Sequence, residues 1–321
     1  MKFSNGHWLL KEGHECFGAQ EVYFTKIEEK KVTICAPTHQ ISNRGDTLGG
    51  VNLTLVITSP APEIIRLQTY HYLGSLRKGP DFDLNLKDTI PLKVTETEEL
   101  ISIQSGTLTL EITKKNFSMI YKRDGKAISK SNTKGLALMK TCWRGHAYDK
   151  GDTENTYMRQ ELSISIGELF YGLGERFSPF VKNGQSIEIW NEDGGTSTEQ
   201  SYKNIPFVLS NKGYGIFVNH PEKVHFEIAT EKVTKIAFGV TGGYLDYYLI
   251  NGPTLKDTLV HFTDLTGKPG LPAPWTFGLW LSTSFTTNYD EKTVMSFIDG
   301  MLDRHIPLRT FHFDCFWMKE F

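Results

Sequence analysis

The sequence predicts a mainly β chain, in which a large antiparallel β-sandwich precedes one strand–helix–strand unit. Short β-rich runs separated by turn residues fill the chain to about residue 250, with no long amphipathic helix among them. After Gly252-Pro253 apolar residues recur at helical spacing, and two apolar runs flank one of the helices. We therefore expect two domains, residues 1–250 and 251–321, which suits a chain of 321 residues.

The first domain is predicted from alternation and turns. In Leu108–Ile112 apolar and polar residues alternate, as in a strand with one buried face. Asp124-Gly125 between apolar runs predicts a hairpin, and Asn211-Lys212-Gly213 before the run 214–218 predicts another. Further strands are expected at Leu53–Thr58, Ile64–Tyr72, Gly106–Thr113 and Val224–Ala229.

The second domain begins with a predicted helix, which carries Leu255, Leu259 and Phe262 on one face behind a capping box of Thr254 and Asp257. A Gly/Pro connector follows. The apolar run Trp275–Leu281 then predicts a strand buried on both faces. A second helix is expected from about Asn288–Glu291, with a stripe formed by Val294, Phe297, Ile298, Met301 and Leu302, and a second strand over about Thr310–Phe316.

The strand–helix–strand order predicts two parallel strands joined by a right-handed crossover. Two parallel strands do not form a stable sheet alone. We therefore interpret this unit as the start of a parallel α/β barrel whose other strands lie outside the chain.

Composition narrows the class of partner. The net charge is −2 and no basic stripe is present, which argues against a nucleic-acid partner. No apolar leader opens the sequence, and no apolar run reaches the roughly 20 residues that span a bilayer. Cys16, Cys35, Cys142 and Cys315 are scattered, which favours reduced thiols in a cytoplasm. We expect a cytoplasmic protein with a small polar ligand and no membrane partner.

In a parallel barrel, functional residues gather at the C-terminal ends of the strands. Residues 283–288 follow the first predicted strand, and the run Asp314–Trp317 lies at the end of the second. Asp314 could accept hydrogen bonds from sugar hydroxyls, while Phe285, Phe316 and Trp317 could pack on a sugar ring. An equal alternative is that Asp314 pairs with a basic residue and the aromatic residues are core. His312 and Asp314 would share a face, but no third ligand is near, so we expect no metal.

Two further segments have unusual composition. Trp190–Glu199 is polar and contains glycine, which predicts a loop. Loops on rigid scaffolds often carry function, although residue types alone favour an ordinary solvated turn here. Tyr171–Phe177 contains Gly-x-Gly but lacks the third glycine of a dinucleotide-binding motif, so its Glu175-Arg176 pair is interpreted as a structural ion pair.

Several segments, in this order, carry a resemblance to glycoside hydrolase family 31. The opening Met-Lys-x-Ser-x-Gly-x-Trp-Leu and the run Asp314–Trp317 are similar to the bacterial α-xylosidases of that family. The segments that resemble the family are Tyr171–Phe177, Trp190–Thr198, Tyr202–Phe207, Gly278–Leu281, Ser284–Asp290 and Phe311–Lys319.

The resemblance implies a mutarotase-like sandwich followed by a (β/α)8 barrel. It implies a retaining α-glycosidase that hydrolyses terminal α-xylosyl residues of xylo-oligosaccharides, uses no cofactor, and is a homo-oligomer at full length. Asp193 and Asp314 match acids that contact the bound sugar, and Phe285, Cys315 and Phe316 match residues that line the same subsite. For Cys315 and Phe316 to line one pocket, the second strand must end or bend near Asp314.

A retaining glycosidase needs two carboxyl groups about 5–5.5 Å apart, one as nucleophile and one as acid/base. The family's catalytic aspartates belong to later barrel motifs that this sequence does not contain, so no catalytic residue is assigned and the chain by itself is expected to be inactive. Three alternatives remain: an α-glucosidase of the same family, a non-catalytic carbohydrate-binding sandwich, and an assembly element.

Overall fold

A computed structural model describes residues 1–5, 9–74, 79–141, 156–192, 198–284, 286–314 and 317–319. It divides the chain into two compact units, Met1–Gly267 and Lys268–Phe321. Each unit is described by itself. Within the described residues, no helix combines the length and the apolar character that crossing a bilayer requires.

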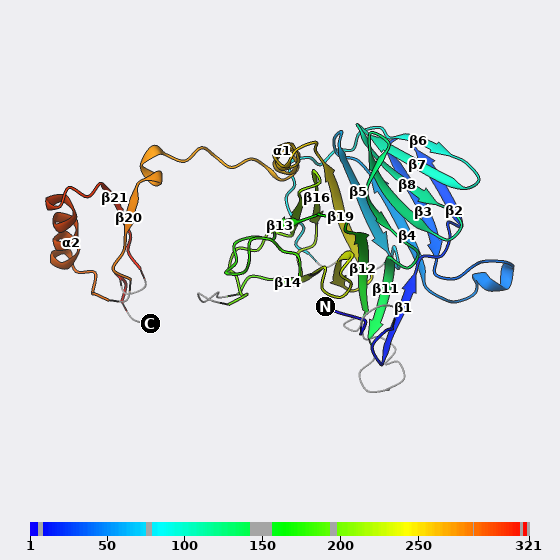
Figure 1. Ribbon diagram of the computed structural model, residues 1–321, viewed down its shortest axis with the longest axis horizontal. Coiled ribbons are helices and arrows are strands. Elements are labelled where there is room, and N and C mark those ends of the chain that lie inside the picture. Colours follow the sequence, from blue (N-terminus) through cyan, green and yellow to red (C-terminus); the bar gives the residue numbers. More distant parts are fainter. Residues whose placement is uncertain are drawn as a thin grey trace. The chain divides into compact units, whose positions relative to one another are not determined.

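Three antiparallel sheets form the first unit (Figure 1). The eight-stranded sheet has the order β13(Phe170–Gly172), β15(Phe207–Ser210), β16(Tyr214–Val218), β19(Tyr244–Asn251), β5(Ile64–Tyr70), β4(Asn52–Thr58), β3(Lys31–Pro37), β2(Phe24–Glu28). The six-stranded sheet has the order β1(His14–Gly18), β11(Leu136–Thr141), β12(Thr156–Ser163), β18(Lys235–Thr241), β17(Val224–Ile228), β14(Gln185–Ile189). The five-stranded sheet has the order β10(Lys126–Ser131), β9(Ser118–Arg123), β8(Leu108–Thr113), β7(Leu100–Ser105), β6(Lys93–Glu96).

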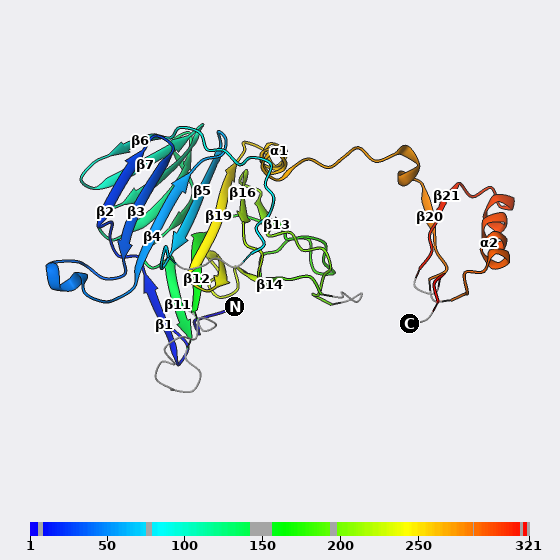
Figure 2. The same ribbon diagram turned by 180° about the vertical axis from the view of Figure 1, so that it is seen from behind.

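The eight-stranded sheet, seen from behind in Figure 2, packs against both of the other sheets. Tyr247 of β19 shows this, because its hydroxyl lies 2.8 Å from that of Tyr121 on β9 and its ring centroid lies 5.0 Å from that of Phe238 on β18. All three side chains are buried. The continuous core between the sheets confirms the predicted sandwich, since strands of all three sheets contribute buried residues to it.

The predicted hairpins are present. Asp124 and Gly125 connect β9 to β10 with φ values of 48° and 76°, the two positive angles that a type I′ turn needs. Residues 211–213 connect β15 to β16, and Gly213 has a φ of 79°. The alternation over Leu108–Ile112 is also confirmed, because the apolar residues are buried and the polar ones half-buried.

The first unit extends to Gly267 because α1(Leu255–Thr266) packs on the outer face of the eight-stranded sheet. Phe262 stacks on Phe207 of β15 with centroids 3.9 Å apart, and Leu265 is buried. The capping box of Thr254 and Asp257 is confirmed. The sequence had placed this helix in the second domain, residues 251–321, whereas in the structure it packs on the sandwich. The limits of the two domains remain a prediction.

The second unit contains β20(Leu279–Leu281), α2(Glu291–Asp303) and β21(Leu308–Phe311). The two strands are parallel, as predicted, with Leu281 opposite Phe311. Both strands differ from their predicted extents. Residues Pro274–Phe277 form a 3-10 helix, because the proline at its first position cannot donate to a strand. β21 begins directly after Pro307 and ends before Asp314.

The predicted burial of the first strand on both faces is wrong for this unit. Leu279 is 43% exposed and Trp280 is 46% exposed. Within the described residues, β20 pairs with β21 alone, so the opposite edge has no neighbouring strand. The apolar stripe of α2 is likewise only partly covered: Val294 is buried, whereas Phe297 and Leu302 are exposed.

Candidate functional site

The C-terminal ends of β20 and β21 bring together the two polar segments that the sequence analysis singled out. The Ser284 hydroxyl donates a hydrogen bond of 3.0 Å to Oδ2 of Asp314, across thirty residues of sequence. His312 N donates to Leu281 O at 2.8 Å, which holds the two strand ends in register beyond the last paired residues. Asp314 is half-buried. The carboxylate therefore lies at the C-terminal ends of the two parallel strands.

Ser284 reaches Asp314 because the backbone turns sharply after β20. Its φ is 46°, which is uncommon for a residue with a side chain. The Ser282 hydroxyl accepts from Ser284 N at 3.0 Å, and the Tyr289 hydroxyl donates to Ser284 O at 3.2 Å. These bonds fix the turn from both sides, so the position of the Ser284 hydroxyl is set by its neighbours.

An aromatic group lies beside this turn. The ring centroid of Tyr289 is 5.2 Å from that of Phe313 and 6.4 Å from that of Phe311. The following Asp290 caps α2, accepting from Thr293 N at 3.0 Å and from the Thr293 hydroxyl at 2.7 Å. These hydrogen bonds hold the pKa of Asp290 below its usual value.

In the first unit, the ends of the loop Trp190–Glu199 are joined by hydrogen bonds. Glu192 N donates to Ser201 O at 3.0 Å. The Asn204 side-chain amide donates to Trp190 O at 2.7 Å, Ser201 O at 2.8 Å and Asn191 Oδ1 at 2.9 Å. The described ends of the segment, residues 190–192 and 198–199, belong to no helix or strand, and backbone and amide groups hold the chain on the two sides together.

The glycines of Tyr171–Phe177 let this motif lie against the chain that follows the loop. Gly172 and Gly174 have φ values of 102° and 88°. A Cβ on Gly174 would lie 2.0 Å from Lys203 O, so only glycine fits there. Glu175 pairs with Lys203 at 3.4 Å, while Arg176 donates to backbone carbonyls. The interpretation of Glu175-Arg176 as an ion pair with each other is therefore wrong.

Of the five residues expected to contact substrate, the structure describes one. Asp193, Phe285, Cys315 and Phe316 lie outside the described residues. Asp314 follows the end of β21 at Phe311, in agreement with the expectation that the strand ends or bends near Asp314. No cluster of three His, Cys, Asp or Glu side chains with metal-site geometry occurs among the residues that the structure describes.

The sequence did not predict which side chains position Asp314 and the two ends of the segment Trp190–Glu199. Ser284 belonged to a polar stretch that was noted, but its bond to Asp314 follows from the strand pairing. Tyr289 and Asn204 were not singled out. The signal for Asn204 was its place in Tyr202–Phe207, a segment that already carried the resemblance.

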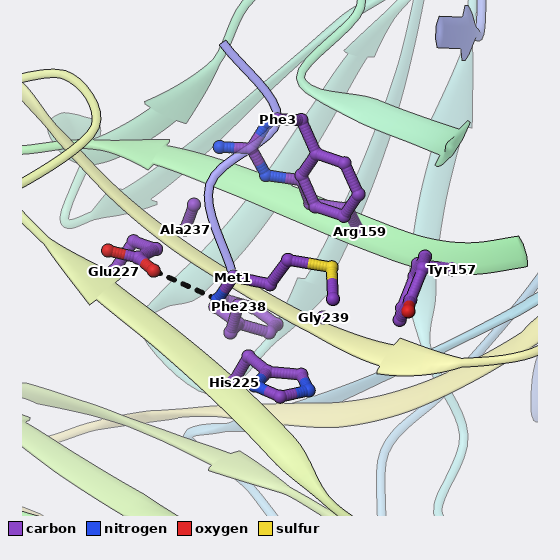
Figure 3. Close-up of a pocket in the computed structure, with 9 residues that line it drawn as sticks. All are labelled: Met1, Phe3, Tyr157, Arg159, His225, Glu227, Ala237, Phe238 and Gly239. Carbon is purple, nitrogen blue, oxygen red and sulfur yellow. Dashed lines mark ion pairs between the residues drawn. The ribbon is translucent and has the colours of Figure 1, made fainter. Parts of the chain in front are cut away.

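A small pocket lies on the outer face of the six-stranded sheet (Figure 3). The Met1 ammonium forms an ion pair of 2.9 Å with Glu227, and the Met1 side chain lies over the sheet beside Tyr157 and His225. The pKa of His225 is lowered to about 4, mainly by burial of the imidazole and secondly by the positive charge of the Met1 ammonium. His225 belongs to β17 of the sandwich.

Comparison with known protein families matches both units. Residues 54–227 match the glycosyl hydrolase 31 N-terminal galactose mutarotase-like domain, and residues 269–321 match the glycosyl hydrolases family 31 TIM-barrel domain. Among solved structures, the GH31 dextranase of Flavobacterium johnsoniae complexed with glucose has a TM-score of 0.73 at 20% identity, over 95% of this chain and 34% of that one. A GH31 α-xylosidase from a soil metagenome, complexed with xylose, has a TM-score of 0.63 at 15% identity over 88% of this chain and 40% of that one. These two likenesses concern the fold.

Sequence relatives are more similar. The α-xylosidase XylQ of Lactiplantibacillus pentosus is 44% identical over all of this chain and 41% of its own length. An α-xylosidase of Emericella nidulans is 42% identical over all of this chain and 42% of its own length, and an α-glucosidase of Bacillus thermoamyloliquefaciens is 28% identical over 73% of this chain and 29% of its own length. The chain thus spans about two fifths of the length of the α-xylosidases that it matches. It belongs to glycoside hydrolase family 31.

Proposed function

We propose that the chain is the N-terminal part of a retaining α-glycosidase that hydrolyses terminal α-xylosyl residues of xylo-oligosaccharides. The observation that carries this proposal is the 44% identity to an α-xylosidase over the whole chain. The identity to the α-glucosidase relative is 28%, which favours the xyloside over the glucoside. The strand–helix–strand unit favours an enzyme over a binding sandwich, since a binding module needs no barrel strand.

The proposed substrate contacts are Asp193, Phe285, Asp314, Cys315 and Phe316. Asp314 supports this because its carboxylate is half-buried, lies just beyond the end of β21, and accepts a hydrogen bond from Ser284. Carboxyl oxygens are the acceptor type that suits sugar hydroxyls. No cofactor is needed, because the reaction uses carboxyl groups alone.

We place the nucleophile and the acid/base beyond residue 321, so the chain by itself should lack activity. The test is to assay the purified chain and the full-length polypeptide with matched aryl α-xyloside and aryl α-glucoside. We expect no turnover by the chain and preferential turnover of the xyloside by the full-length polypeptide. Clear turnover by the chain alone would refute the placement of the catalytic groups, and a preference for the glucoside would favour the α-glucosidase.

The preference for xylose is attributed to Cys315 and Phe316, which offer no partner to the C6 hydroxyl of glucose. Leaving a buried hydroxyl unpaired costs about 1–3 kcal/mol. In the full-length polypeptide, Phe316→Ser should therefore narrow the ratio of kcat/KM for xyloside over glucoside by about tenfold. An unchanged ratio, with the fold intact by circular dichroism, would count against this account.

We also propose a cytoplasmic location and a homo-oligomeric full-length protein. The free thiols of Cys16 and Cys35 are compatible with a reducing compartment. Sedimentation of the full-length polypeptide tests the second part, since a monomer would exclude it.

A further inference from the structure

We propose that Arg176 is a positioning residue, which clamps together the two chain segments, here called stems, that flank Asp193 in the sequence. The first stem is residues 188–192 and the second stem is residues 199–204. This inference rests on the proposed function, because the loop matters to catalysis only if Asp193 contacts the sugar. The clamp itself is argued from the described stems alone.

Each nitrogen of the Arg176 guanidinium has an acceptor. Nη2 donates to Glu188 O of the first stem at 2.8 Å, and Nη1 donates to Glu199 O of the second stem at 2.8 Å. Nε donates to Leu173 O, in the motif that carries Arg176, at 3.2 Å. One planar group therefore ties both stems to the glycine-containing turn.

Asn204 extends the clamp. Its side-chain oxygen accepts from Nη2 of Arg176, and its side-chain nitrogen donates to Trp190 O in the first stem and Ser201 O in the second. Ser201 is buried, and its hydroxyl donates to Glu175 O. The stems are thus connected through one arginine and one asparagine, in addition to the direct bond from Glu192 N to Ser201 O.

The arrangement of the acceptors around residue 176 favours an arginine at this position. The three nitrogens serve acceptors that lie in different directions, and only a guanidinium presents donors in such a fixed fork. A lysine has one ammonium group at the end of a flexible stem and would reach fewer of these carbonyls. Burial lowers the pKa of Arg176, the direction expected for a cation removed from water. The acceptors that the guanidinium contacts are neutral carbonyl and amide oxygens.

The glycines explain why the clamp can form. The turn 172–174 lies directly on residues 203–207, where Leu173 N donates to Phe207 O at 2.9 Å and Glu175 N donates to Lys203 O at 2.9 Å. Arg176 leaves this turn in contact with the second stem. The segment Tyr171–Phe177 therefore positions the Arg176 guanidinium between the two stems.

The first experiment measures the clamp in the chain itself. Hydrogen exchange with mass spectrometry would follow peptides that cover residues 186–206 in the native chain, in Arg176→Met and in Arg176→Lys. Both variants should exchange about tenfold faster at the stems, because several hydrogen bonds are lost together. Arg123→Met is the matched control, since Arg123 also donates to two carbonyls, Gly252 O at 3.0 Å and Lys212 O at 2.5 Å, outside the stems. Unchanged exchange in Arg176→Met, or full rescue by lysine, would overturn the clamp.

The second experiment measures its consequence in the full-length polypeptide. Arg176→Met and Arg176→Lys should raise KM for an aryl α-xyloside about tenfold while kcat changes less than about threefold, because a binding contact is misplaced and the reacting carboxyl groups are not. Arg123→Met should leave both constants unchanged. Faster exchange with an unchanged KM would overturn the positioning role. If the native full-length polypeptide does not hydrolyse the xyloside, the proposed function fails, and the exchange data alone decide on the clamp.

Discussion

Two apolar strands of similar composition have opposite environments in this chain. Within β19, residues Leu245–Asn251 are buried, whereas Leu279 and Trp280 of β20 are each more than two fifths exposed. β19 has a strand on either side, with α1 on one face and the second layer of the sandwich on the other. β20 has one neighbouring strand among the described residues. An apolar sequence thus predicts that a strand is suited to burial. Whether the strand is buried depends on the strands and helices that pack against it.

The difference has an energetic consequence. Burial of apolar surface contributes about 25 cal/mol per Å², and an isolated pair of strands gains little of it. The sandwich therefore holds most of the stability of the chain. The second unit exposes apolar side chains that further strands could cover. This is compatible with its match to a TIM-barrel domain.

The largest expected effect is a contrast between two phenylalanines. Phe226 is fully buried in β17, and Phe277 is 75% exposed in the second unit. Phe226→Ala should lower the free energy of unfolding by about 3–5 kcal/mol, because it removes apolar contacts and leaves a cavity. Phe277→Ala should change it by less than about 0.5 kcal/mol. Urea unfolding followed by circular dichroism measures both.

Equal effects of the two substitutions would show that the second unit is packed as tightly as the first. The contrast between β19 and β20 would then be lost. A loss of less than about 1 kcal/mol in Phe226→Ala would instead show that the sandwich core relaxes around the missing ring.

A smaller effect concerns pH and is confined to the sandwich. The pKa of His225 is about 4 in the folded chain and about 6.5 in an unfolded chain. Between these values the unfolded chain binds more protons, so stability falls as the pH is lowered through 6.5. From pH 7 to pH 5 the loss should be on the order of 2 kcal/mol. The charged groups that face His225 are the Met1 ammonium, Glu188, Lys223 and Glu227.

The measurement is urea unfolding at pH 7 and pH 5, on the native chain and on His225→Gln. The substitution should remove most of the difference between the two pH values. His305→Gln, at an exposed histidine of the second unit, should keep the native difference. Identical pH dependence in the native chain and His225→Gln would assign the loss to other groups.

Local rules predicted the parts of the fold that depend on local chemistry. Asp124-Gly125 predicted its hairpin because two adjacent residues must both adopt positive φ. Thr254 and Asp257 predicted a helix start because both halves of the capping box lie within four residues. The parallel pairing of β20 with β21 followed from the order of elements.

The parts that failed depend on groups that are distant or have no side-chain signature. Trp275 and Phe277 look like strand residues, but Pro274 starts a 3-10 helix there. The partners of Arg176 are mainly backbone carbonyls, which no residue pattern reveals. The place of Asp314 near a strand end left two interpretations open and the family resemblance assigned it to the site, whereas the hydroxyl beside it was found only from the structure.

Glu231 anchors the first residues of the chain through its buried carboxylate. One of its oxygens accepts from Phe3 N at 2.9 Å, Ser4 N at 2.6 Å and the Ser4 hydroxyl at 2.7 Å, and the other contacts Arg159. The first residues of the chain lead into β1, which covers the edge of β11. Loss of this carboxylate would remove the acceptor of these three hydrogen bonds and loosen the segment that precedes β1, the strand that pairs with β11 over Ala137–Thr141. A single buried acid thus fixes the start of the chain to the sandwich.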